Sequence, residues 1–291
     1  MAQQRVRIVT DSTADLSNPL REKYGLEMIP LNVHFGDELY KDQVDLSPEQ
    51  FYEKLRTAKI LPRTSQPSPG EFMELYKKIA DEGAETIASI HLSAKLSGTY
   101  QSAKVAAASL PDLDIEVIDG QSASVGTAVQ AIAAAEVAAR GGTKEEVLAA
   151  AEAAKTKEGV YFVVDTLEYL QRNGRIGKAQ AFLGTMLNVK PLLTLIDGIV
   201  CPYERVRGKK RAVGRMFEIM EEDLTKREEA GEKWDRLLVA ISHADSREEA
   251  EKVAAEIQTR FDNVEMIIEY IGPVIGTHVG PGTVAVIYCP M

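Results

Sequence analysis

The feature that most constrains the fold is an alternation, through the first half of the chain, of short β-branched runs with helices that carry their own start signals. Ser47-Pro48 and Ser68-Pro69 each place a capping serine before a proline, and Gln50 or Glu71 follows where it closes a capping box. An alanine-rich helix is predicted over 122–140, and strands are predicted at 5–10, 27–35, 86–92, 115–119 and 160–165. Strands that alternate with helices predict an α/β domain with a parallel sheet and helices on both of its faces.

The pattern changes after Gly159. Asp197-Gly198 is a strong hairpin signal between two apolar runs. Helices are predicted at 209–226 and 246–260, and strands at 236–241, 264–271 and 283–289. We therefore expect two domains: an N-terminal α/β domain over 1–158 and a smaller α+β domain over 159–291.

Composition excludes several classes of protein. A chain of 291 residues with 45% hydrophobic and 27% charged residues matches neither a disordered nor a fibrous protein. Its two cysteines, Cys201 and Cys289, are too few and too far apart for a disulfide framework or a zinc site, so we expect a reducing cytoplasm. Neither end predicts a signal peptide or a stable membrane insertion, and we expect a monomer.

The charge is distributed unevenly. A net charge of -10 disfavours nucleic acid as a partner. Residues 171–215, however, hold ten Lys or Arg against Asp197 and Glu204, a local charge of +8. Two interpretations stay open for this segment: a solvated surface, or a docking patch for an acidic partner or a phosphate.

Three polar turns are candidates for a binding site. Residues 63–69 form a stiff loop rich in hydroxyl groups, and 276–283 is a glycine-rich turn that contains a single histidine, His278. Residues 91–100 follow an apolar strand and open a predicted helix near Ser97 and Gly98. Free backbone N–H groups and the helix dipole favour an anion at such a helix start. Ser97 could equally be a plain helix cap.

Two kinds of chemistry compete at these turns. Ser97 and His278 could act as nucleophile and base in a hydrolase or transferase for a small carboxylate or phosphate ester. No acidic residue is identifiable as the partner that would orient the histidine, and clustered hydroxyls equally suit a resting carboxylate, so we favour binding over catalysis. The four histidines lack metal-ligand spacing, and no cofactor motif occurs, so we expect neither metal nor cofactor.

Six motifs in order resemble the DegV family of bacterial fatty-acid-binding proteins, nearly from end to end. They are VTDSTADLS at 9–17, RTSQPSPGEF at 63–72, LSAKLSGTYQSA at 92–103, VIDGQSASVGTA at 117–128, YLQRNGRIGKAQAFLGTMLNVKPLL at 169–193 and GPVIGTHVGPGTVAV at 272–286. The resemblance implies a long-chain fatty acid such as palmitate held between the two domains. It also implies a lipid carrier that presents this acid to a separate fatty-acid kinase, which converts it to an acyl phosphate.

The resemblance also assigns residues. The family's carboxylate-binding threonine and serine match Thr64 and Ser97, and its histidine near the carboxylate matches His278. Their neighbours Ser65 and Gly98 are added as candidates. Such a polar binding site is also expected on energetic grounds, because burying a carboxylate costs several kcal/mol unless fixed hydrogen-bond donors bind it.

The acyl tail requires an apolar tunnel, since each methylene removed from water contributes about 0.8 kcal/mol. The expected tunnel residues are Phe162, Leu183, Met186, Leu187, Leu193, Val274 and Ile275. For the kinase, the expected docking residues lie in the basic segment: Arg172, Arg175, Lys209, Lys210 and Arg211.

Overall fold

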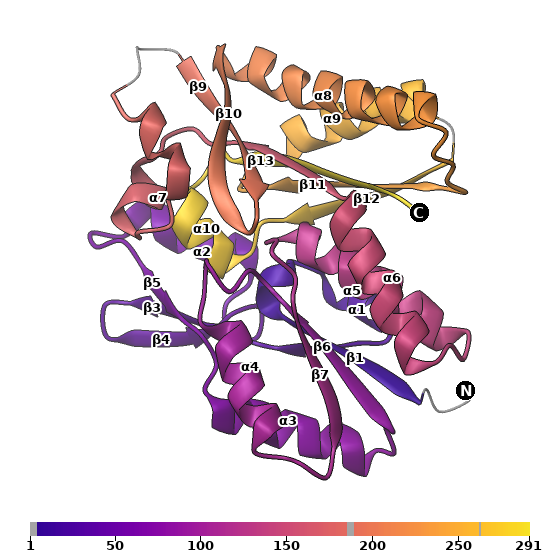
Figure 1. Ribbon diagram of the computed structural model, residues 1–291. Coiled ribbons are helices and arrows are strands. Elements are labelled where there is room, and N and C mark those ends of the chain that lie inside the picture. The colour runs from indigo at the N-terminus through magenta and orange to yellow at the C-terminus, as the bar shows by residue number, and fades with distance from the viewer. Residues whose placement is uncertain (1–4, 185–188, 262) are drawn as a thin grey trace.

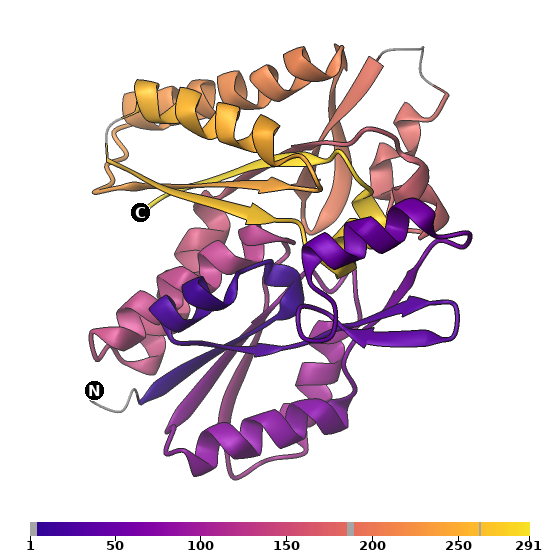
Figure 2. The same cartoon turned by 180° about the vertical axis from the view of Figure 1, so that it is seen from behind.

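Two layers of β-sheet stand one above the other in the computed structural model, which describes residues 5–184, 189–261 and 263–291 (Figures 1 and 2). The lower layer is a four-stranded sheet and the upper layer a six-stranded sheet, and a small three-stranded sheet lies beside them. Within these ranges, no helix combines the length and the apolar character needed to cross a membrane.

The four-stranded sheet is parallel throughout, in the order β2-β1-β6-β7. Its strands are β1 Val6–Asp11, β2 Leu26–Ile29, β6 Thr86–His91 and β7 Asp114–Asp119. Val9 and Ile87 face helices α3 (Pro69–Asp81) and α4 (Thr99–Ala108), while the alternate residues face α5 (Val125–Ala139). α6 (Lys144–Lys157) and α1 (Asn18–Tyr24) pack beside α5. The predicted parallel sheet with helices on both faces is therefore confirmed.

Local signals explain where several helices begin. Ser47 and Ser68 form complete capping boxes with Gln50 and Glu71 at the starts of α2 (Pro48–Thr57) and α3. The side-chain oxygen of each serine accepts a backbone N–H, and the Gln or Glu side chain returns to the N–H of the serine. Both predicted helix starts are confirmed, each at the serine that the sequence indicated.

The six-stranded sheet is mixed, in the order β10-β9-β8-β13-β11-β12, with β11 and β12 parallel and the other neighbours antiparallel. Its strands are β8 Gly159–Val163, β9 Val189–Ile196, β10 Ile199–Arg207, β11 Leu237–His243, β12 Val264–Tyr270 and β13 Val284–Pro290. Helices α8 (Lys209–Glu229) and α9 (Arg247–Arg260) cover its outer face. The predicted hairpin is confirmed, since Asp197 and Gly198 have φ values of 50° and 72° at the turn between β9 and β10.

Two sequence predictions need correction. The strand predicted over 27–35 is two strands in different sheets, because Pro30 has no N–H for a ladder and interrupts the run. After this break, β3 (Asn32–Phe35) pairs antiparallel with β4 (Glu38–Lys41) and β5 (Arg63–Ser65), so the predicted loop at 63–69 begins as a strand. The first half of the turn predicted over 276–283 is helical, because it belongs to α10 (Pro273–Val279), which begins with a proline suited to the first helical position.

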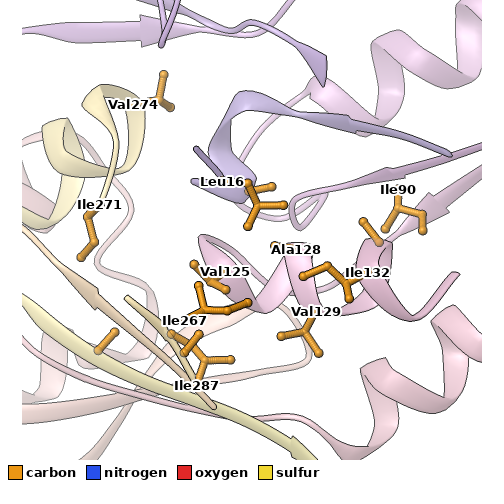
Figure 3. Close-up of a cluster of buried hydrophobic side chains, with 14 of the residues drawn as sticks. Leu16, Ile90, Val125, Ala128, Val129, Ile132, Ile267, Ile271, Val274 and Ile287 are labelled. Carbon is orange, nitrogen blue, oxygen red and sulfur yellow. The ribbon is translucent and has the colours of Figure 1, made fainter. Parts of the chain in front are cut away.

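One hydrophobic core joins the two layers. Val125 and Val129 of α5 lie beside Ile267 of β12 and Ile287 of β13, as the close-up shows (Figure 3). The many alanines of α5 let the helix be buried on nearly all sides between the sheets. The six-stranded sheet begins at Gly159, and we retain the division into 1–158 and 159–291 as a proposal.

Candidate functional site

A narrow cavity lies between the two halves of the molecule. The cavity is tight: the space in which the centre of a water-sized sphere can move is about 100 Å³. Both halves supply its apolar walls, which consist of Leu31, Leu92, Leu96, Ala123, Val160, Phe162, Leu170, Leu195, Val200, Ile271, Val274, Ile275, Val279, Ala285 and Ile287. A narrow cavity with mostly aliphatic walls suits a ligand with a large apolar part.

Polar side chains gather at one end of this cavity, and contacts between them show that they form one cluster. Thr64 and His278 are hydrogen-bonded, with 2.9 Å between Oγ1 and Nε2. The amide of Gln66 lies against Gly98, and Arg175 donates from Nε to the carbonyl oxygen of Leu96, beside Ser97. Thr64, Ser65, Gln66, Ser97, Arg175 and His278 all line the cavity.

His278 is held as a neutral imidazole. Burial, and secondarily the charge of Arg175, lower its pKa to about 4. Its Nδ1 is buried and has no hydrogen-bond partner among the residues that the structure describes. A neutral ring with Nε2 protonated would donate to Thr64 Oγ1, which leaves the hydroxyl proton of Thr64 free for an acceptor in the cavity.

Ser97 and Gly98 stand at the start of α4. Gly98 is the N-cap residue and provides no side-chain cap. The hydroxyl of Ser97 lies 3.0 Å from that of Thr99, in the first turn of the helix. The N–H groups of this turn add a positive dipole end to the polar cluster, as the sequence predicted for an anion site.

Ser65 has a different environment from Thr64. The β3–β5 register pairs Thr64 with Val33 and Ser65 with Asn32, so the two neighbouring side chains point to opposite faces of the small sheet. Ser65 Oγ lies 3.0 Å from His34 Nε2 and accepts a hydrogen bond from Asn32 Nδ2 at 3.2 Å. Its hydroxyl is thus engaged on the far face, and its role in binding a carboxylate stays a prediction.

The geometry gives no support to the alternative of a nucleophile–base pair. Ser97 and His278 both line the cavity, but the hydroxyl of Ser97 bonds to Thr99 and the imidazole of His278 to Thr64. Without a partner on Nδ1, His278 also lacks a group that would orient it as a base. Among the described residues, no group of three or more His, Cys, Asp or Glu could hold a metal ion.

The predicted tail residues have different positions. Phe162, Val274 and Ile275 line the cavity. Leu193 is fully buried in the core, and Leu183 packs against that core from a partly exposed position, but neither is part of the cavity wall. Met186 and Leu187 lie outside the described residues.

The sequence interpretation missed Gln66 and Arg175 as residues of the polar end. Gln66 stands inside the hydroxyl-rich motif, so its position there was a usable signal. Arg175 was assigned to kinase docking because of its charge, but it also borders the cavity. Its guanidinium is held by the carbonyl oxygens of Leu96 and Asn173, a contact between segments distant in sequence that no local pattern indicates.

The other predicted docking residues differ in how free their charges are. Arg172 pairs with Glu168 of its own helix α7 (Glu168–Arg172), and Lys209 lies between Asp165 and Glu249. Lys210 and Arg211 are exposed and form no salt bridge with any described residue. Two of the predicted docking residues, both at the start of α8, are therefore cations without a salt-bridge partner among the described residues.

Fold and site together define an α/β protein with a mostly apolar cavity, polar at one end, between its two halves. The chain belongs to the DegV family, whose model, described as "Uncharacterised protein, DegV family COG1307", matches residues 5–291. This confirms the resemblance read from the six motifs.

Solved structures of other proteins resemble the chain over nearly its whole length. A structure described as fatty acid binding of a DegV family protein from Thermus thermophilus has 38% sequence identity and a TM-score of 0.88, covering 99% of this chain and 100% of that one. DegV from Bacillus subtilis, described as a fatty acid binding protein, has 35% identity and a TM-score of 0.89, with the same coverage. A stearic-acid-binding protein from Eubacterium ventriosum has 25% identity and a TM-score of 0.86, covering 98% of each chain.

Proposed function

We propose that this protein binds a long-chain fatty acid such as palmitate, with the carboxylate at the polar end of the cavity and the tail along its apolar walls. The observation that carries the proposal is the Thr64–His278 pair at the head of an otherwise apolar cavity. The same class of ligand is supported by the relatives from Thermus thermophilus and Bacillus subtilis, which are described as binding fatty acid, and by the one from Eubacterium ventriosum, described as binding stearic acid.

The head and the tail of the ligand have separate tasks. Burying the methylenes of palmitate contributes roughly 12 kcal/mol before ordering costs, so the tail provides most of the affinity. Thr64 and Ser97 offer hydroxyl protons to the carboxylate, and the cationic Arg175 stands at the mouth. These donors offset the cost of removing the carboxylate from water and fix the depth at which the chain sits.

Two single substitutions test the head of the site. We expect Thr64→Ala and Ser97→Ala each to weaken palmitate binding by about 1–3 kcal/mol, because each removes a donor from a buried anion. Titration calorimetry measures the affinities, and mass spectrometry of lipid extracted from the purified protein identifies the native ligand. Thr259→Ala and Ser109→Ala, on exposed positions of α9 and at the end of α4, are the matched controls.

Affinity that is unchanged in both head variants would reject the assignment of the carboxylate site. A protein that carries no acyl chain after purification and binds no palmitate would reject the function itself.

We further propose that the bound acid is presented to a fatty-acid kinase, which phosphorylates its carboxylate. Arg175 at the mouth and Arg172 on α7 provide positive charge on one side. Lys209 of α8 forms a salt bridge with Asp165, three residues before α7, so the start of α8 lies in the same region. The unpaired Lys210 and Arg211 add to this surface, which suits an acidic face on a partner.

Charge reversal tests the docking surface. We expect Lys210→Glu with Arg211→Glu to reduce acyl-phosphate formation by an added fatty-acid kinase while palmitate binding stays unchanged, because the pair lies outside the cavity wall. Lys226→Glu, on an exposed position near the other end of α8, is the matched control. Acyl-phosphate formation at the wild-type rate in the double variant would remove the docking proposal and leave the lipid-binding proposal intact.

A further inference from the structure

Asp15 is a buried acid that no described cation neutralises. It follows the short helix η1 (Ser12–Ala14), has 2% of its surface exposed, and forms no salt bridge among the described residues. Asp11 and Asp42 lie close enough to repel a negative charge on it. These conditions favour the neutral carboxylic acid over the carboxylate.

The two oxygens of Asp15 contact two different walls of the cavity. Oδ1 accepts a hydrogen bond from the N–H of Gly272, the N-cap of α10, at 3.0 Å. Oδ2 lies 2.6 Å from the hydroxyl of Ser124, the residue that precedes α5. Ser124 lines the cavity, as do four residues around α10, but Asp15 itself does not.

The contact with α10 depends on a glycine. A Cβ at position 272 would approach Asp15 Oδ1 to 2.6 Å, so a larger residue would push α10 away from the acid. At the other end of the same short helix, His278 is bonded to Thr64. α10 is thus fastened to the N-terminal half at both of its ends.

We propose that Asp15 is a positioning residue of the fatty-acid site: as a neutral acid, it accepts the Gly272 N–H on Oδ1 and donates its own proton from Oδ2 to Ser124. This inference rests on the proposed fatty-acid binding. Ser124 has φ 54° and ψ -147°, a backbone conformation that non-glycine residues adopt only when their surroundings enforce it. The hydrogen bond to Asp15 is one such constraint, and it fixes the cavity wall at the start of α5.

Hydrogen bonds from Ser124 and Gly272 favour the ionised form of Asp15, but burial has the larger effect and two neighbouring acids add to it. Asp11 on β1 and Asp42 after β4 repel a second negative charge, and Tyr52 on α2 donates its proton to the carbonyl oxygen of Ile271. Arg21 on α1 is engaged by Leu16 and Gln43, and its charge acts on Asp42. Burial raises the pKa of Asp15 well above its usual range, in agreement with a neutral acid.

Substitution of Asp15 by asparagine tests whether its side chain is a neutral acid or an ionised carboxylate. Asn matches the neutral acid, since its carbonyl can accept from Gly272 and its amide can donate to Ser124. We expect Asp15→Asn to bind palmitate within about twofold of wild type and Asp15→Ala to bind about tenfold more weakly. The NMR signal of the His278 imidazole should shift in the alanine variant and stay in place in the asparagine variant.

Two further variants make the test independent of folding defects. Gly272→Ala displaces α10 while it leaves Asp15 intact, so it should also weaken binding and shift the His278 signal. Ser17→Ala removes a different contact between the halves, the bond to Glu269 at 2.6 Å, and should change neither. The difference between the infrared spectra of wild type and Asp15→Asn at neutral pH should contain the band of one protonated carboxylic acid.

Each outcome has a distinct meaning. Binding that is lost equally in Asp15→Asn and Asp15→Ala would show that the negative charge is required and overturn the neutral acid. Affinity and a His278 signal that are unchanged in Asp15→Ala would overturn the positioning role. If wild-type protein binds no fatty acid, the proposed function fails, while the His278 signal and the infrared band still test Asp15 in the free protein.

Discussion

At the scale of single residues, the polar end of the cavity is built from neutral donors with one cation at its edge. His278 is kept neutral by burial, while Thr64 and Ser97 contribute hydroxyl groups. A fully charged head would bind the carboxylate more strongly, but its desolvation would also cost more. Neutral donors therefore suit the proposed function, in which the site binds a fatty acid and releases it.

The first prediction concerns the charge of His278. We expect its pKa, about 4 in the free protein, to rise when palmitate binds, because a nearby carboxylate favours the imidazolium form. NMR titration of the ring protons with and without palmitate measures both values. The pKa of His243, which burial also lowers to about 4 but which does not line the cavity, should change less. A fall in the His278 pKa on binding would contradict a carboxylate at this end.

At the scale of elements, α10 connects the site to the rest of the fold. Its residues Val274, Ile275 and His278 reach the cavity, and its small residue Gly276 lies against α2. A Cβ on Gly276 would come within 2.6 Å of Tyr52 Oη and 2.8 Å of Phe51 Cε1. The glycine therefore sets how closely α10 approaches α2, and with it the width of the cavity.

The second prediction compares two glycines within helices. Gly276→Ala should lower the free energy of unfolding by about 1–3 kcal/mol, because overpacking against fully buried aromatic rings exceeds the gain in helix propensity. Gly214→Ala, in α8, has no atom within 4 Å of the new Cβ and should raise stability by up to about 1 kcal/mol. Denaturant unfolding measures both. Equal changes in the two variants would show that packing against α2 does not limit α10.

Elements with strong local signals could be predicted from the sequence, and elements fixed by distant contacts could not. The capping boxes at Ser47 and Ser68 and the turn at Asp197 are local, and each was predicted correctly. β5 has only three residues, and they form a strand because they pair with β3, which lies about thirty positions earlier in the sequence. Family motifs indicated Thr64 and His278 as site residues, whereas Arg175 borders the cavity through a contact with Leu96 that only the fold creates.

At the scale of the whole molecule, hydrogen bonds and ion pairs fasten the two halves around the cavity. Bonds that cross between them include Thr64–His278, Asp15–Gly272, Tyr52–Ile271, Ser17–Glu269, Tyr24–Glu265, Arg56–Asp245, Arg236–Glu136, Ser93–Gly198 and Arg175–Leu96. Most of the exposed ion pairs contribute little individually. The contacts of Thr64, Asp15 and Tyr52 are made with α10 or with the two residues before it, so they bear most directly on how the cavity closes.

The last prediction follows from a second buried acid in this interface, Asp42, which is fully buried and bonded to the Ser12 hydroxyl at 2.7 Å. Burial raises its pKa from 3.8 to about 7, so the folded state holds a proton that the unfolded state has lost. A raised carboxyl pKa contributes stability that is fully present below about pH 4 and is lost as the pH rises toward 7.

Asp42→Asn removes this titration while it keeps an acceptor for Ser12. Relative to wild type, the variant should therefore gain stability between about pH 4 and pH 7, by up to about 4 kcal/mol, and show no further relative change above that range. Denaturant unfolding of both proteins across this range measures the difference, in which the opposite contributions of buried histidines such as His278 cancel. A stability difference that does not change with pH would mean that Asp42 is ionised in the folded protein. The hydrogen bond from Ser12 would then outweigh the effect of burial on the pKa of Asp42.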